Sequence, residues 1–412
     1  MTTGHERVTA ACARAARAAE AEARGTPASW SAPSGGARRW FAIGDPQATP
    51  DRIFAVLDRH GLLADDGVLA PDAGLLSIGD HFDFPGDVTE VERAGREVLA
   101  WLAAHPRDQV VLLAGNHDLS RVIELAHETD GSFSSARALA VEIHGASGAE
   151  DRAAREREFA ARYPAIPTPG IARVDCSSFS AAQRALVQRL LLERRLRLAA
   201  VARVAGVDVL VTHAGVTVRE LGLLGMADAA GPGPVARALD DLLERRVDDA
   251  RAAWTRGEPA PLDLGPVHVA GTTGREGGGL LYHRPARRDR PGSVDQAWEL
   301  DPVAPRRFEP AALPRAFAQV AGHSGHRRCA RELAGWVDAN APPDRAIALR
   351  TLRDDAAGPR YAAGVDPRPG ALILIDPELA RAPLEDVELL PLDGAPDAHA
   401  TAIDAPATSR SR

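Results

Sequence analysis

The chain has 412 residues, of which 45% are hydrophobic and 26% are charged, and its formal net charge is −8. This composition is that of an ordinary globular protein, long enough for one large domain or two smaller ones. No block of Lys and Arg stands out, which argues against a nucleic-acid duplex as partner, and no apolar run is long enough to span a membrane. The three cysteines are far apart and follow no metal-ligand spacing, so we expect a cytoplasmic protein without disulfides.

The first part of the chain alternates predicted strands and helices. A surface helix is predicted at 8–24, followed by a linker rich in Pro, Ser and Gly. Strands are then predicted at 39–43, 75–78 and 109–113, separated by helices at 50–63 and 88–104. This β-α-β-α-β order is typical of an α/β fold with parallel strands.

The rest of the chain is less uniform. Residues 131–169 show little periodicity, and we expect them to form an insertion or cap. The later predicted elements are helices at 180–205, 234–256 and 326–338, and strands at 207–211, 267–270, 280–282, 317–321, 346–352 and 371–375. The chain therefore divides into an N-terminal helix and flexible linker at 1–36, a main domain at 37–390 and a disordered tail at 391–412.

Five of the predicted strands end in side chains that can bind a metal ion. These residues are Asp45 and Gln47, Asp80 and Asp83, Asn116 and His117, His213, and His323. In open α/β sheets the carboxyl ends of the strands line the ligand crevice. Carboxylate, amide and imidazole groups without a thiolate suit a hard or borderline divalent ion such as Mn²⁺, Fe or Zn²⁺. Two such ions ~3.5–4 Å apart form the clamp used for displacement at phosphorus.

Each of these residues also has a structural explanation when it is taken alone. Asp and Asn are common in turns and at helix N-termini, and Gln47 alone would be a solvated loop residue. A histidine that ends an apolar strand is often a satisfied core residue, and Arg284 alone would be a surface ion-pair partner. The ordered set favours the metal site, because chance would have to place every member at a strand end.

The same motifs resemble those of the calcineurin-like metallophosphoesterase superfamily. That family is marked by D-x-H, G-D-x-x-D-R-G, G-N-H-[DE], a strand-terminal H-A-G or H-G-G and a late G-H. Here they read GDPQ, GDHFDFPG, GNHD, THAG and GHSGH, in the same order, from Trp40 to about Trp336. The HAG form and the segment GGGLLYHRP look closest to the bacterial phosphoprotein-phosphatase-like branch. The resemblance implies a two-sheet αββα sandwich with outer helices.

The resemblance also implies two divalent metal ions as cofactors, with Mn²⁺ expected and Fe or Zn²⁺ as alternatives. Asp45 and Gln47 would hold the first ion, and Asp80 would bridge both ions. The residues that would complete the second ion are Asn116, His213 and His323.

Three further roles follow from the same resemblance. His117 would not be a ligand but would donate a proton to the leaving oxygen or steady the phosphoryl group. Asp83 would orient His117 by a hydrogen bond, and Arg284 would neutralise a phosphate oxygen.

The sequence departs from the family pattern at two positions. Gln47 stands where the family has histidine, and its neutral amide oxygen favours a weaker first site or a harder metal such as Mn²⁺ or Mg²⁺. Phe84 replaces the arginine that follows the second aspartate, so one phosphate-binding cation is missing there unless Arg284 or Arg275 serves. These departures bear on the substrate class more than on the reaction.

We therefore expect a metal-dependent phosphoesterase that hydrolyses a phosphoester with a hydroxide bridging the two ions. The expected partner is a phosphorylated small molecule, nucleotide or phosphoprotein, and neither a nucleic-acid duplex nor a membrane. One alternative is a degenerate member that binds metal or a phosphorylated ligand without turnover. Another alternative keeps the enzyme class and makes the protein a phosphodiesterase or nucleotide hydrolase.

Overall fold

The first of two main sheets is built from short strands that are buried almost throughout. The computed structural model describes residues 2–31, 37–289, 305–338 and 349–397. Its first sheet contains β1 (Arg39–Ile43), β2 (Ala73–Ser77), β3 (Val110–Leu113), β4 (Leu196–Arg197) and β15 (Leu390–Leu392). The spatial order is β15-β1-β2-β3-β4, in which β1 to β4 are parallel and β15 is antiparallel to β1.

The second main sheet mixes parallel and antiparallel pairs. Its strands are β5 (Ala199–Val204), β6 (Val207–Thr212), β11 (Ala318–Ala321), β12 (Arg350–Asp355), β13 (Gly358–Ala363) and β14 (Leu372–Leu374). They lie in the order β13-β12-β14-β11-β6-β5. Strand β11 is parallel to both β14 and β6, whereas β12 and β5 pair antiparallel with their neighbours.

Strands from the two sheets pack against one another through a shared core cluster. In β3, Val111 and Leu113 join a core cluster that also contains Val209 and Val211 of β6. The alternating β3 residues, with Leu112 among them, join a different cluster formed with the helices. Successive side chains of a strand point to opposite faces, so both faces of each sheet are covered. The predicted α/β class is confirmed.

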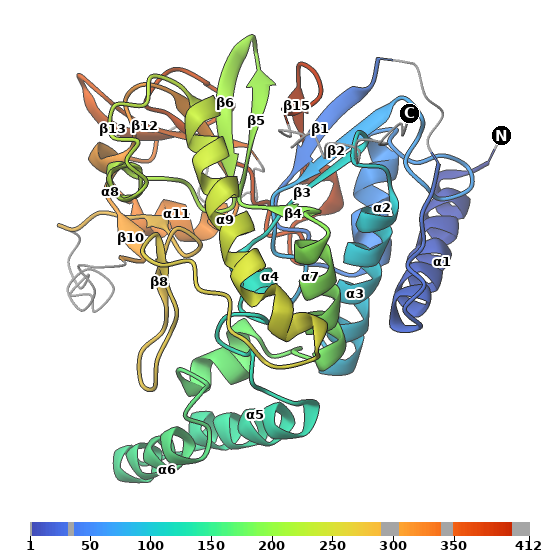
Figure 1. Cartoon of the computed structure of the whole chain (residues 1–412). Coiled ribbons are helices and arrows are strands. Elements are labelled where there is room, and N and C mark those ends of the chain that lie inside the picture. Colours follow the sequence, from blue (N-terminus) through green and yellow to red (C-terminus); the bar gives the residue numbers. More distant parts are fainter. Residues whose placement is uncertain (1, 32–36, 290–304, 339–348, 398–412) are drawn as a thin grey trace, which may run out of the picture.

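Helices cover the outer faces of the sheets (Figure 1). The larger ones are α1 (Gly4–Ala23), α2 (Pro50–Arg59), α3 (Val88–Ala104), α7 (Ala181–Leu192) and α9 (Pro232–Thr255). The first three pack on one another, and α9 packs on β5 and β6. Among the described helices, none combines the length and the apolar character that a membrane crossing requires.

Residues 131–169, whose sequence shows little periodicity, are mostly helical. That they form an insertion or cap stays a prediction. The segment contains α5 (Asp130–Gly145) and α6 (Ala149–Arg162), and the π-helix η1 (Ile171–Asp175) follows it. Thr129 caps α5 by accepting a hydrogen bond from the amide of Ser132. Such a cap residue marks a helix start that apolar periodicity alone does not indicate. These helices have their own apolar cluster, which includes Phe133 and Phe159. In Figure 1 α5 and α6 project away from the two sheets.

The remaining elements are short. They are α4 (Asn116–Leu119), α8 (Val218–Leu223), β7 (His268–Val269), β8 (Gly278–Gly279), β9 (Arg284–Pro285), β10 (Arg307–Phe308), η2 (Pro310–Ala312), α11 (His326–Glu332) and η3 (Leu384–Asp386). The strand predicted at 280–282 is a turn that follows β8. The strand predicted at 346–352 begins at Arg350, and 346–348 lie outside the described residues.

The long helix predicted at 180–205 ends at Leu192, and the chain then forms β4 and β5, the second of which leads into a hairpin. Ala205 and Gly206 have φ values of 47° and 80° and connect β5 to β6. Two consecutive residues with positive φ are the mark of a tight hairpin turn. The prediction of one long helix overlooked this Ala-Gly pair, which marks the hairpin turn.

The first part of the tail predicted to be disordered is ordered. Residues 390–392 form β15 on the edge of the first sheet, and Asp397 still bridges Val201. The rest of that predicted tail, 398–412, lies outside the described residues, as do 32–36 of the predicted linker.

We expect Gly44→Ala to destabilise the protein, because Gly44 lies where β1 meets the end of β14. A methyl group there would lie 2.6 Å from the carbonyl carbon of Ile375 and 2.8 Å from the amide nitrogen of Asp376. Both are backbone atoms, so the free energy of unfolding in urea should fall by about 1–3 kcal/mol. Gly131→Ala is the control, because nothing lies within 4 Å of its added carbon. Equal stabilities of the two variants would contradict this packing.

Candidate metal centre

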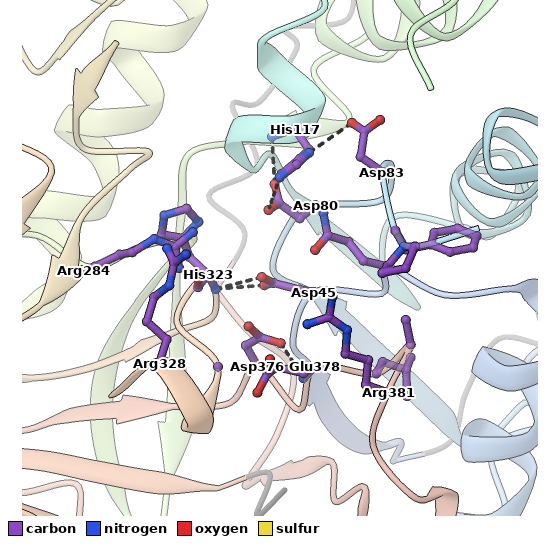
Figure 2. Close-up of a pocket in the computed structure, with 16 residues that line it drawn as sticks. Asp45, Asp80, Asp83, His117, Arg284, His323, Arg328, Asp376, Glu378 and Arg381 are labelled. Atoms are coloured by element: carbon purple, nitrogen blue, oxygen red, sulfur yellow. Dashed lines mark hydrogen bonds and ion pairs between the residues drawn. The ribbon is translucent and has the colours of Figure 1, made fainter. Parts of the chain in front are cut away.

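The carboxyl ends of six parallel strands, three from each sheet, bring the polar residues together. Strands β1, β2 and β3 lead to Asp45, Asp80 and Asn116, while β6 and β11 lead to His213 and His323. Figure 2 shows Asp45, Asp80, His117 and His323 facing one cavity of about 230 Å³. The rule that strand ends converge on a ligand crevice therefore holds for both sheets.

Three buried residues, Asp80, His213 and His323, can hold a metal ion. One ligand atom from each lies within 4.8 Å of the others. The Nε2 atom of His213 is 3.4 Å from Asp80 Oδ1 and 3.2 Å from His323 Nδ1. The amide oxygen of Asn116 lies 3.0 Å from the same Nε2 atom. Oxygen and imidazole nitrogen in this combination suit a borderline divalent cation.

The hydrogen bonds of His213 explain why a cation fits this point. Its Nδ1 atom lies 2.9 Å from the carbonyl oxygen of Ile78, which can only accept, so Nδ1 donates. In neutral His213 the Nε2 lone pair then faces further acceptors. A proton on Nε2 can take the place of a cation. Burial disfavours the charged ring, but Asp80 and Asp45 outweigh burial and raise the pKa of His213 to about 9.

His323 supplies a second sign that the site is built for a ligand. Its Nε2 atom is buried and has no hydrogen-bond partner among the described residues. Burial, together with the nearby guanidinium of Arg284, lowers the pKa of His323 well below its ordinary value. His323 is therefore neutral, which is the form that binds a metal.

Asp45 and Gln47 lie beside this cluster rather than within it. Both Asp45 oxygens accept the amide of His323, at 3.0 and 2.9 Å, and Oδ1 is 4.0 Å from His213 Nδ1. Burial raises the pKa of Asp45 to about 6. His213 opposes this increase, and the negative charge of Asp80 adds to it. The amide nitrogen of Gln47 donates to the carbonyl of Phe82 at 2.8 Å, which leaves the amide oxygen as its ligating group.

The backbone around the site adopts an unfavourable conformation that the surrounding bonds hold in place. Asp80, Asp83 and His323 have φ values of 58°, 61° and 58°. Residues other than glycine rarely adopt such values, and they cluster at functional sites. Asp118 accepts the amides of Asp80 at 2.9 Å and of Gly115 at 2.8 Å, and thereby ties the loop after β2 to the loop after β3.

His117 is held next to the cluster but is not one of its three ligating residues. Its Nδ1 atom lies 3.0 Å from Asp83 Oδ2, and its Nε2 atom faces Asp80 Oδ2 at 3.8 Å. Burial disfavours the charged ring, but Asp80 and Asp83 outweigh it and raise the pKa of His117 to about 9. His117 is thus protonated near neutral pH in the metal-free protein and directs Nε2 toward the cavity.

Arg121 was not predicted from the sequence. Its side chain is fully buried and donates to Asp83 Oδ2 at 2.7 Å, while the backbone and hydroxyl of Ser178 donate to Asp83 Oδ1. Burial alone would raise the pKa of Asp83, but Arg121 and His117 outweigh burial and lower it. Asp83 therefore stays ionised and fixes His117, as the resemblance implied. Arg121 lies five residues after Asn116, but no spacing rule points to its role.

Asp376 was also missed. It follows β14, the sixth parallel strand, and lines the cavity on the side of Asp45 (Figure 2). Burial and the negative charge of Asp45 raise the pKa of Asp376 well above its ordinary value. The strand-end rule that selected the other residues would have found it, because the predicted strand 371–375 ends directly before it.

Arg284, the predicted phosphate ligand, also lines the cavity, and Arg275 does not. The Arg284 guanidinium donates to the carbonyl oxygen of His323.

No protein-family model and no curated protein matches the chain. The evidence for a site is therefore the arrangement of the side chains themselves.

We expect Asp83→Asn to lower the pKa of His117 in the metal-free protein. The neutral amide no longer stabilises the imidazolium, so the ring should lose its proton at a pH about 1 to 3 units lower. NMR titration of the histidine ring signals measures this change. His213 is the internal control, because its raised pKa depends on Asp80 and Asp45. An unchanged His117 titration would show that Asp83 is not its partner.

We expect His213→Ala to weaken Mn²⁺ binding by at least about tenfold, because losing a ligand should cost no less than losing a residue that only hydrogen-bonds a ligand. Calorimetric titration of metal-free protein with Mn²⁺ measures the affinity. His144→Ala is the control, since it removes an exposed imidazole from α5. Equal affinity in the two variants would show that His213 does not bind the ion.

Proposed function

We propose that the protein is a metal-dependent phosphoesterase with the two-sheet αββα sandwich of the calcineurin-like metallophosphoesterases. The observation that supports this most strongly is the pairing of two devices in one cavity. One device is the cluster of Asp80, His213 and His323, which can hold a cation. The other is His117, whose Nε2 atom faces Asp80 while Asp83 holds its other nitrogen.

We infer that the residues around the cavity would hold two divalent cations. Asn116, His213 and His323 would hold one of them, and Asp80 would be shared. Asp45 and Gln47 would hold the other, and the carboxylate of Asp376 would add negative charge on that side. Because Gln47 is neutral, a hard ion such as Mn²⁺ is expected, with Fe or Zn²⁺ as alternatives.

Metal ions held there would supply Lewis-acid chemistry, polarising a phosphoester and making water a better nucleophile at neutral pH. The chain's own contribution is the proton on His117. As the bond between phosphorus and the leaving oxygen breaks, Nε2 would give this proton to that oxygen, so the alcohol leaves neutral. Asp83 would keep the ring oriented through Nδ1, and Arg121 would keep Asp83 ionised.

A binding protein without turnover is the second candidate. Gln47 and Phe84 favour it, because they replace a histidine and an arginine of the pattern that the sequence resembles. Hydrolysis of p-nitrophenyl phosphate by Mn²⁺-loaded protein separates the two candidates. A rate that chelation abolishes supports the enzyme, whereas two bound ions with no rate above buffer support the binder.

We expect His117→Ala to lower kcat by about 10²–10⁴, with metal content unchanged. The variant removes the proton donor but none of the proposed ligands, so elemental analysis should give the same metal content as wild type. His144→Ala serves again as the control with full activity. Loss of metal in His117→Ala would contradict the role of this residue as an acid.

A further inference from the structure

Three arginines line the same cavity as the metal-binding residues. Arg284 comes from β9, Arg328 from α11 and Arg381 from the segment after β14. Figure 2 shows the side chain of Arg328 reaching toward Arg284, and that of Arg381 reaching in from the other side. Only Arg284 was expected from the sequence.

These guanidiniums lack carboxylate partners. Arg284 bonds a carbonyl oxygen, and the side chains of Arg328 and Arg381 make no hydrogen bond or ion pair in the part of the chain that the structure describes. Most other arginines along the chain are paired, as Arg315 is with Asp354 at 2.7 Å. Burial lowers the pKa of Arg284 to about 10, and the like charge of Arg328 contributes to this decrease. Two like charges that repel each other at the cavity would both be stabilised by an anion between them.

The chemistry of phosphate esters determines which anion suits this arrangement. A phosphomonoester has three terminal oxygens and is largely dianionic near pH 7, since its second pKa is about 6. If two of these oxygens faced metal ions held by the proposed ligands, a third would remain for the arginines. A phosphodiester has two terminal oxygens and a single charge, so its second ester group would have to occupy the place of that third oxygen.

We propose that Arg328, together with Arg284, binds the third terminal oxygen of the substrate and selects phosphomonoesters over phosphodiesters. This inference rests on the proposed phosphoesterase function. It assigns to α11 the cation that Phe84 does not provide at its own position. The planar guanidinium can give two parallel hydrogen bonds to such an oxyanion, which a lysine cannot.

Arg327 provides a matched control for Arg328. It is the preceding residue of α11 and is exposed, as Arg328 is, but unlike Arg328 it does not line the cavity. Substituting either arginine by alanine removes one guanidinium from the same helix. A difference between the two variants therefore reports the position of the charge rather than the net charge.

The test compares p-nitrophenyl phosphate with bis-p-nitrophenyl phosphate, using Mn²⁺-loaded full-length protein. We expect wild type to prefer the monoester. Arg328→Ala should lower kcat/KM for the monoester about tenfold or more, chiefly through KM, and change that for the diester less than about twofold. Arg327→Ala should change neither. A wild-type preference for the diester, or equal losses on both esters, would overturn the proposal.

Binding of inorganic phosphate, measured by calorimetry, tests the same point without turnover. Arg328→Ala should bind phosphate about tenfold more weakly than Arg327→Ala. If wild type hydrolyses neither ester, the proposed function fails, but this titration still decides whether Arg328 binds phosphate. Equal phosphate affinity in the two variants would overturn the role of Arg328 whether or not the enzyme is active.

Discussion

The ends of six strands place carboxylates and the lone pairs of ring nitrogens close to one another, and the rest of the structure depends on this arrangement. Asp45 and Asp80 are buried and Asp376 is half-buried around one cavity, and His213 directs a ring nitrogen at further acceptors. Such an arrangement is unfavourable without a proton or a cation to share. The raised pKa values of Asp45 and His213 are the response of the metal-free protein to this constraint. A bound cation would remove the repulsion, so the same feature that strains the metal-free site favours binding.

The surrounding fold explains how this arrangement persists. Left-handed backbone at Asp80 and His323 costs on the order of 1–3 kcal/mol for each residue. The fully buried β2 and the close backbone contact at Gly44 leave these loops little room to relax. Asp118 adds a local clamp between the loops after β2 and β3. The two-sheet core therefore acts as the support that fixes ligand positions before any ion arrives.

The sequence indicated those parts of the site that are local in the chain. Asn116 and His117 directly follow a strand of apolar residues, so strand and ligand could be recognised together. Arg121 and Arg328 could not, because each acts together with a residue that is distant in the sequence. Arg121 bonds Asp83, 38 positions before it, and Arg328 lies near Arg284. The α/β class followed from alternating strands and helices. The hairpin between β5 and β6 and the helices of the insertion did not, because turn and cap residues override apolar periodicity there.

The two departures from the resembled family pattern acquire a common explanation under the proposed function. Gln47 supplies no charge to the first ion, yet Asp376 places a carboxylate beside Asp45. Phe84 supplies no cation to the substrate, yet Arg328 places a guanidinium beside Arg284. In each case the missing group has a counterpart on a later element of the second sheet or its helices. Charge balance in the cavity can thus be kept while individual motif positions change, because electrostatic interactions in a buried site depend on distance and not on position in the chain.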